Sequence, residues 1–341
     1  MKRKDFVIMK KLISVLLIIS TLMLVSCGKS ATGVTADSNQ TESSNTIEDN
    51  SKNIFSSTLE EVPEEYKNKI SQGGVETQEI EFKHNNHTKK AVVYLPPNYD
   101  ENNQYNILYI LPGASGQHNV IFEDAGEEST FKNILDHMII NGDIQPMIAV
   151  TPDIYPDDIE RLNADNFDYV ISDFRDELTD VLIPTIESKY SSYAKSTSED
   201  DLIASREHRA FAGCSMGGAI CWDILATKTQ YFYYYAPTAA GSFENYYEYG
   251  GVAGKLQSTL KELNYTKDDF FIYGTDGTKD VTYDKMNSLI KRFKSDYTDL
   301  FVFTDNDKSQ GNITYKVLNN AEHNYNYMFM YLYNALQAFF K

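Results

Sequence analysis

The chain has 341 residues, of which 42% are apolar and 13% aromatic, so it can bury the core of one large domain or of two. Its formal net charge of −18 argues against nucleic acid or anionic lipid as a partner. Its cysteines and histidines form no cluster with metal-ligand spacing, so the sequence predicts no metal site, and no cofactor is expected.

Residues 1–26 have the pattern of a secretion signal, with a basic start and an apolar run over 12–25 that is too short to span a bilayer. The run ends in Leu24, Val25, Ser26 and Cys27, which resembles the lipobox of bacterial lipoproteins. An ordinary secretion signal with an incidental cysteine is the alternative. We expect lipidation of Cys27 to anchor the protein on the extracellular face of the cell membrane.

The stretch from 28 to about 57 is rich in polar residues and has almost no large apolar ones, which is typical of a disordered tether. We therefore expect a signal peptide over 1–26, the lipidated cysteine and tether over 27–58, and one folded domain over 59–341. Without the signal peptide the formal charge falls to about −22, because five basic residues and one acidic residue are lost.

The folded part is expected to alternate strands and helices, which predicts a mostly parallel α/β sheet with helices on both faces. Ligands of such sheets bind beyond the carboxyl ends of the strands. The expected strands are 77–83 and 89–95 around a turn at 84–87, then 105–111, 147–151, a strand entering residue 214, 231–236, 269–274 and 313–318. The expected helices are 130–141, 167–190 with a break or kink at Pro184, 216–226, 252–263, 283–297 and 327–340.

Residues 209–218 predict a nucleophile elbow, a tight strand-to-helix turn with Ser215 at its apex. Gly213 and Gly217 flank the serine at the two positions where a side chain would collide with neighbouring backbone. A lone Gly-x-Ser-x-Gly motif is weak evidence. Here an acid and a histidine follow the serine later in the chain, which is the order typical of the α/β-hydrolase fold.

A serine needs a base to activate it, and the base needs an acid to orient it. His323 is the predicted base, because it lies in a polar loop between the last strand and the last helix. Asp276 and Asp280 both follow the strand predicted at 269–274. We favour Asp280, which stands closer to the next helix, over Asp276, which precedes Gly277 and is typical of a turn.

Two backbone N–H groups are predicted to bind the negative oxygen of a tetrahedral intermediate. One belongs to Met216, immediately after the serine, and the other to Ala114, in the small-residue loop over 112–116. His118, just past that loop, is a candidate for substrate contact, with an ordinary surface histidine as the alternative. The tyrosines of 231–249 include Tyr246 and Tyr247, which we expect to stack on a phenolic acid or a sugar ring, whereas those on the strand are expected in the core.

Several motifs between about residue 76 and the end of the chain carry a family resemblance. They are Tyr-Ile-Leu-Pro-Gly at 109–113 with Gly116, Ile-Ala-Val-Thr-Pro at 148–152, Arg-Glu-His-Arg-Ala at 206–210, the elbow, Gly-Thr-Lys-Asp at 277–280 and Glu-His at 322–323. Together they resemble the feruloyl esterases of carbohydrate esterase family 1, which belong to the esterase D group of α/β-hydrolases. One departure is Pro112-Gly113, where that family commonly has His-Gly.

The resemblance implies that Ser215, Asp280 and His323 form a catalytic triad and that Ala114 and Met216 form the oxyanion hole. It also implies an esterase that removes feruloyl or acetyl groups from plant cell-wall polysaccharide such as arabinoxylan. Other members of the group act on different esters, so fold and triad alone do not fix the substrate. A catalytically silent glycan-binding lipoprotein on the same fold is the alternative from another class.

Overall fold

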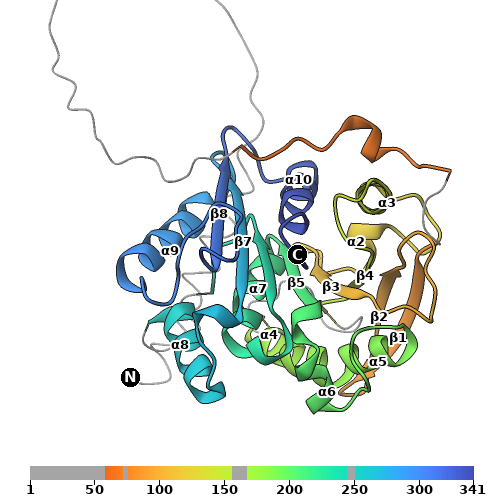
Figure 1. Cartoon of the computed structure of the whole chain (residues 1–341), viewed down its shortest axis with the longest axis horizontal. Helices are drawn as coiled ribbons and strands as arrows, with labels where there is room; N and C mark the ends of the chain where they lie inside the picture. The colour runs from red at the N-terminus through yellow and green to blue at the C-terminus, as the bar shows by residue number, and fades with distance from the viewer. Residues whose placement is uncertain (1–57, 72–75, 156–166, 244–249) are drawn as a thin grey trace, which may run out of the picture. The chain divides into compact units, whose positions relative to one another are not determined.

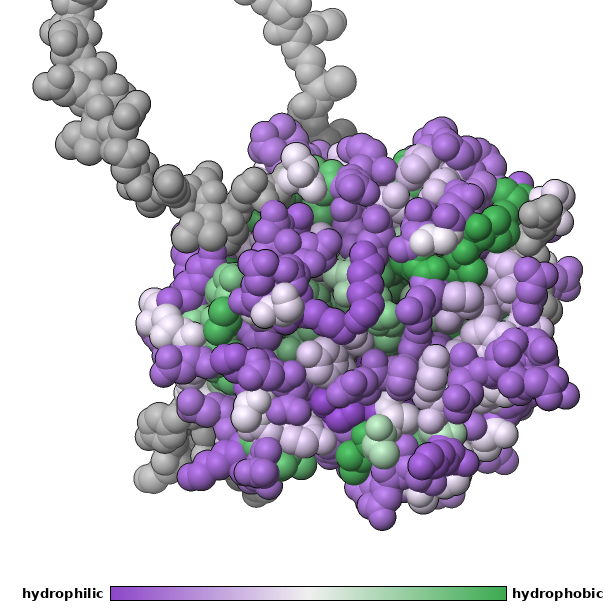
Figure 2. Space-filling model, in the orientation of Figure 1, coloured by the Kyte–Doolittle hydropathy of each residue, from purple (hydrophilic) through white to green (hydrophobic). Residues whose placement is uncertain are grey.

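The computed structural model describes residues 58–71, 76–155, 167–243 and 250–341. The predicted signal peptide, Cys27 and the predicted tether up to residue 57 lie outside these ranges, as do Tyr246 and Tyr247. Among the described helices, none is long and apolar enough to cross a membrane. The face of the folded part in Figure 2 is mostly hydrophilic, with smaller hydrophobic areas between the polar side chains.

The strands of the described residues form one sheet of eight, in the order β1-β2-β4-β3-β5-β6-β7-β8 (Figure 1). β1 pairs antiparallel with β2, and β2 with β4, whereas every other neighbouring pair is parallel. The mostly parallel sheet predicted from the sequence is therefore confirmed. The strands are β1 (Gln78–His84), β2 (His87–Tyr94), β3 (Asn106–Leu111), β4 (Met147–Pro152), β5 (Arg209–Cys214), β6 (Tyr234–Thr238), β7 (Phe271–Gly277) and β8 (Ile313–Leu318).

Helices cover both faces of the sheet and bury two apolar cores (Figure 1). One core is covered by α2 (Asn119–Phe122), α3 (Thr130–Asn141) and α10 (Tyr325–Leu336). The other is covered by α4 (Phe167–Glu177), α5 (Ile183–Lys189), α6 (Glu199–Ala204), α7 (Met216–Thr227), α8 (Gly251–Leu263) and α9 (Tyr283–Asp296). This layering explains why the central strands read as continuous apolar runs rather than alternating ones.

β3 shows how one strand serves both cores. Tyr109 and Leu111 point into one core, and Leu108 and Ile110 point into the other. All four side chains are fully buried. Successive side chains of a strand face opposite sides of the sheet, so a strand with helices above and below it must be apolar at every position.

The long helix predicted over 167–190 is interrupted, but not at Pro184. α4 passes through a π-helical turn, Leu178–Leu182, into α5, and Pro184 lies in the first turn of α5, where a missing N–H costs little. The turn directly follows Glu177, whose buried carboxylate oxygens lie 2.6 and 2.8 Å from Lys89 Nζ. The break therefore coincides with a buried ion pair between α4 and β2.

The strand predicted over 231–236 begins later than expected, at Tyr234. A 3₁₀ turn, Thr229–Tyr231, takes up the preceding residues. The guanidinium of Arg206 donates hydrogen bonds to the carbonyl oxygens of Thr229 and Phe232 at 2.7 to 3.2 Å, which holds this segment outside the sheet. Tyr234 and Tyr235 on the strand itself are buried, as the core interpretation of the strand tyrosines predicts.

Candidate active site

The backbone of Ser215 adopts a strained conformation at the junction of β5 and α7, with φ of 55° and ψ of −116°. A Cβ atom on Gly213 would lie 2.1 Å from the carbonyl oxygen of Gly217, and one on Gly217 would lie 2.5 Å from the carbonyl oxygens of Leu111 and Pro112. Only glycine fits at either position. This is the elbow that the glycine spacing predicts, and it holds the serine hydroxyl at the carboxyl end of the strand.

Ser215, His323 and Asp280 form a continuous chain of hydrogen bonds. Ser215 Oγ lies 2.9 Å from Nε2 of His323, and Nδ1 of the same ring lies 2.8 Å from both carboxylate oxygens of Asp280. The Asp280 side chain is fully buried, whereas 27% of the His323 side chain is exposed. The geometry is that of a nucleophile, a base and an acid that orients the base.

The loops that carry the acid and the base are bonded to each other. The loop after β7 donates its Thr278 N–H to the carbonyl of Leu318 at 3.0 Å and its Lys279 N–H to the carbonyl of Ala321 at 3.0 Å. Asn324, directly after the histidine, caps α10 by accepting a hydrogen bond from the N–H of Tyr327. These backbone contacts fix the relative positions of two side chains that are 43 residues apart.

Asp276, the alternative acid, does not contact His323 through any hydrogen bond among the described residues. β7 runs on through Gly277, so Asp276 lies within the strand, and its interpretation as a turn residue is wrong. Its side chain is fully buried, and it accepts a hydrogen bond from the N–H of Gly277 at 2.8 Å. The structure therefore places Asp280, and not Asp276, against the histidine.

Thr282 links the two carboxyl groups, and sequence reasoning missed it. Its hydroxyl oxygen lies 2.7 Å from Asp280 Oδ1 and 3.1 Å from Asp276 Oδ2, and its N–H donates to Asp280 Oδ1 at 2.8 Å. An aspartate followed two residues later by threonine is a signal for this kind of turn, because the carboxylate accepts the N–H two positions on. One hydroxyl proton serves only one of the two carboxylates.

The environment pushes the pKa values of the two carboxyl groups apart. Burial, and then the charge of Asp280, raise the pKa of Asp276 to about 7. Burial acts in the same direction on Asp280, but hydrogen bonds from His323 and from Thr282 outweigh it and hold the pKa of Asp280 below its ordinary value. A protonated Asp276 is able to donate to Thr282, whose own proton is then free for Asp280.

The base itself has a raised pKa. The hydrogen bond to Asp280 raises the pKa of His323 above its ordinary value, burial opposes this, and the charge of Asp280 adds to it. A histidine acts as a general base only when it is neutral. The carboxylate therefore makes the imidazole a stronger base, and it also moves the pH at which the base becomes available upward.

The loop that holds Ala114 is tied directly to the elbow. The carbonyl of Pro112 accepts the N–H of Gly217 at 3.1 Å, and the carbonyl of Gly113 accepts the N–H of Gly116 at 3.0 Å. Proline at position 112, where the family commonly has histidine, still provides the backbone carbonyl that accepts the N–H of Gly217. Met216 is the first residue of α7, where N–H groups have no partner within the helix, so it remains the predicted second donor.

Tyr325 is a second residue that sequence reasoning missed. Its hydroxyl accepts the N–H of Gly113 at 2.8 Å, and burial raises its pKa to about 12. Because that N–H is already occupied, the next donor along the loop is Ala114. The position of Tyr325, two residues after His323, was only a weak signal that it belongs to the site. Its contact with Gly113, 212 residues away, is visible only in the fold.

His118 lies on the side of the sheet where β3 and β4 end, and two carboxylates hold it. Its Nδ1 is 2.7 Å from Asp153 Oδ1 and its Nε2 is 3.3 Å from Glu79 Oε2. The hydrogen bond to Asp153 raises the pKa of His118. Its predicted contact with substrate stays a prediction.

Within the described residues no group of three or more His, Cys, Asp or Glu side chains has the arrangement of a metal site.

The arrangement as a whole is suited to acyl transfer. A serine oxygen activated by a neutral imidazole attacks a carbonyl carbon, and the N–H groups predicted at Met216 and Ala114 would stabilise the oxygen that becomes negative. Each donor of this kind contributes about 3 kcal/mol to lowering the barrier.

Comparison with known proteins relates the chain to esterases. The family described as putative esterase matches residues 83–241. Endo-1,4-beta-xylanase Y of Acetivibrio thermocellus is 34% identical over 286 residues, which are 82% of this chain and 24% of that protein. An endo-1,4-beta-xylanase/feruloyl esterase of Xylanibacter ruminicola is 26% identical over 52% of this chain and 23% of its own length. The chain thus spans about a quarter of each of these relatives.

Solved structures with a similar fold are also esterases. The feruloyl esterase module from Clostridium thermocellum, a mutant complexed with sinapinate, is 30% identical, with a TM-score of 0.71 over 83% of this chain and 94% of that one. A ferulic acid esterase from Anaeromyces mucronatus in complex with ferulic acid is 19% identical, with a TM-score of 0.59 over 82% and 96% of the two chains. At that identity, the second structure shows a shared fold.

Substitution of the two aspartates separates their roles. We expect Asp280→Asn to lower kcat for an aryl ester by about 10⁴-fold, because the amide no longer holds the imidazole in the correct tautomer. Asp276→Asn leaves Asp280 and its hydrogen bonds to His323 in place and should change kcat by less than about threefold. Steady-state kinetics at pH 8 test this, and a larger loss for Asp276→Asn than for Asp280→Asn would reverse the assignment.

The raised pKa of His323 predicts the position of the acid limb of the pH profile. We expect kcat/KM to rise with pH through an apparent pKa above the ordinary histidine value of about 6.5. Loss of the carboxylate in Asp280→Asn should move this limb to lower pH in the residual activity. His118→Ala should retain the limb. A kcat/KM that is flat from about pH 5 to 8 in the unmodified enzyme would remove histidine from the mechanism.

Proposed function

This chain belongs to the esterase family of the feruloyl esterase modules, and on that premise we propose that it is a serine carboxylesterase of plant cell-wall polysaccharide. It removes acyl groups, feruloyl or acetyl, from a polymer such as arabinoxylan. The observation that carries the proposal is the chain of hydrogen bonds from Ser215 through His323 to Asp280 at a strained elbow. The relatives that are xylanases support a plant cell-wall polymer as the substrate.

The reaction proceeds in two halves. In the first, Ser215 Oγ attacks the ester carbonyl while Nε2 of His323 takes the hydroxyl proton, and the resulting tetrahedral intermediate collapses to an acyl-enzyme. As the bond from the carbonyl carbon to the sugar oxygen breaks, the same proton passes from His323 to that oxygen, which leaves as a hydroxyl group. In the second half, His323 takes a proton from water as it attacks the acyl-enzyme, and returns that proton to Ser215 when the carboxylic acid is released. Asp280 stays ionised and stabilises the imidazolium in both halves.

The aromatic acyl group is favoured by two relatives, whose structures hold sinapinate and ferulic acid respectively. Tyr246 and Tyr247 are the residues that we propose to stack on such a ring, although both lie outside the described residues. His118 is proposed as a further contact, because it lies beyond the end of β3, on the same side of the sheet as the serine.

A panel of esters tests the activity. The protein should hydrolyse methyl ferulate and feruloylated arabinoxylan, and Ser215→Ala should lower kcat by about 10⁶-fold and abolish labelling by a fluorophosphonate. Circular dichroism should show an unchanged fold, because the serine hydroxyl contributes chemistry rather than packing. If the protein hydrolyses acetyl esters but not feruloyl esters, the acyl group that it removes is acetyl. Unchanged turnover in Ser215→Ala would refute the mechanism, and an inactive but glycan-binding protein would support the silent alternative.

We also propose that the protein is a lipoprotein held on the extracellular face of the membrane through Cys27. The support is the sequence alone, with a basic start, a short apolar run and a cysteine directly after it. In a bacterial host, Cys27→Ser should move the esterase from the membrane fraction into the medium or leave it unprocessed, with its turnover number unchanged. Membrane retention of Cys27→Ser at the level of the unmodified protein would contradict the anchor.

A further inference from the structure

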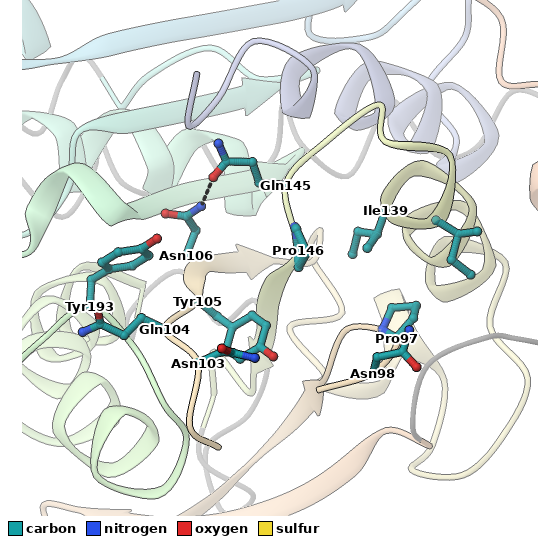
Figure 3. Close-up of a pocket in the computed structure, with 11 residues that line it drawn as sticks. Pro97, Asn98, Asn103, Gln104, Tyr105, Asn106, Ile139, Gln145, Pro146 and Tyr193 are labelled. Carbon is teal, nitrogen blue, oxygen red and sulfur yellow. Dashed lines mark hydrogen bonds between the residues drawn. The ribbon is translucent and has the colours of Figure 1, made fainter. Parts of the chain in front are cut away.

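A groove of about 1170 Å³ opens at the amino-terminal ends of β3 and β4, between the end of α3 and the segment after α5 (Figure 3). Five of its lining side chains are amides, and the others are prolines, isoleucines and tyrosines. The lining contains no acidic or basic side chain, although the chain carries a net charge of −18. The amides are Asn98, Asn103, Gln104, Asn106 and Gln145.

The amides retain hydrogen-bonding capacity toward a ligand. Asn98 and Asn103 are exposed, and neither side chain bonds to another group in the described part of the chain. Gln104 donates one N–H to the carbonyl of Ser192 at 3.4 Å, and Asn106 donates to Gln145 Oε1 at 3.3 Å, the bond drawn in Figure 3. An amide offers two donors and an acceptor, so the exposed amides of Asn98, Asn103, Gln104 and Gln145 have groups left over. Asn106 is 2% exposed, and its amide already bonds to Gln145 and to His208.

Tyr193 gives the groove a rigid aromatic wall, and it lies next to Asn106 in Figure 3. Its ring stacks on His208 with centroids 3.5 Å apart and planes 10° from parallel. His208 is held in turn, because its Nδ1 lies 2.8 Å from Asn106 Oδ1. The tyrosine is half-buried, so one face is fixed by stacking while the rest of the side chain remains partly exposed to solvent. An aromatic surface of this kind packs against the C–H face of a sugar ring.

We propose that this groove binds a neutral polysaccharide chain at a site separate from the catalytic one. Hydroxyl groups both donate and accept hydrogen bonds, as amides do, and a neutral polymer is not repelled by an acidic protein. An anionic ligand would meet no basic side chain here, and a cationic one would meet no carboxylate in the lining. The choice of xylan as the polymer rests on the proposed function.

The groove and the catalytic serine lie at opposite ends of two neighbouring parallel strands, β3 and β5. Asn106 begins β3 in the groove, and Leu111 ends β3 beside Gly213 of the elbow strand. The five steps from Asn106 to Leu111 span about 17 Å, so the groove is not a subsite for the sugar that carries the scissile ester. Binding there keeps the enzyme on a long polymer and raises the local concentration of ester without adding a contact at the reaction centre.

Retention on an insoluble polymer that lacks esters tests the groove apart from the active site. The probe is insoluble arabinoxylan from which acyl groups have been removed by alkali, and the protein is the full chain. We expect the unmodified protein to bind, and Asn103→Ala with Gln104→Ala, or Tyr193→Ala, to bind about tenfold more weakly. Tyr193→Phe, which keeps the stack on His208, and Gln257→Ala, an exposed amide on α8, should bind like the unmodified protein.

Thermal unfolding of each variant checks that it is folded, and the exposed Asn103 and Gln104 give a test even where Tyr193→Ala fails to fold. Equal retention of all folded variants, or no retention of the unmodified protein, would overturn the groove as a glycan site. The assay with methyl ferulate is independent of it. Retention through the groove without ester hydrolysis would support the groove as a glycan site and refute the esterase activity. Hydrolysis without retention would support the esterase activity and refute the groove as a glycan site.

Discussion

The site depends on the backbone of Ser215, which lies where residues with a side chain are rarely found. Such a conformation costs on the order of 1–3 kcal/mol and persists only when its surroundings over-determine it. β5 supplies this restraint because it is hydrogen-bonded on both edges, to β3 and to β6, and the N–H of Ser215 continues the pairing by donating to the carbonyl of Thr238 at 3.0 Å. The pairing of β5 within the sheet thus holds Ser215 in its strained conformation, and the serine hydroxyl projects beyond the end of the strand toward the imidazole of His323.

A second constraint is the burial of two carboxyl groups behind the histidine. A buried charge must be paired, and Asp280 is paired with His323 and with the backbone and hydroxyl of Thr282. Burial, and then repulsion by the charge of Asp280, raise the pKa of Asp276 to about 7, so a second full charge is disfavoured. The protonated member stabilises the ionised one through Thr282.

Local patterns predicted the parts of this site that depend on neighbours in sequence. The elbow, the helix over 130–141 and the strand over 313–318 follow from glycine spacing and from apolar runs, and the structure has them at those positions. The later start of β6 was not predictable, because Arg206 fixes the segment before it through carbonyl contacts 23 and 26 residues away. Tyr325 was missed for the same reason, since its contact with Gly113 exists only in the folded chain. Thr282 had a local signal in its spacing from Asp280, but its contact with Asp276 depends on the fold of the loop after β7.

The position of the neutral groove relative to the serine constrains what the groove does. β3 begins in the groove and ends beside β5, the strand that leads into the elbow. Because β3 is buried on both faces and paired with β5, the groove and the elbow are held at a fixed separation. A ligand shorter than that separation occupies one site or the other but does not couple them. The groove therefore has no effect on the chemistry of a small ester and contributes only with a polymer long enough to pass both. The net negative charge of the chain also disfavours an anionic polymer, which is consistent with a neutral glycan in the groove.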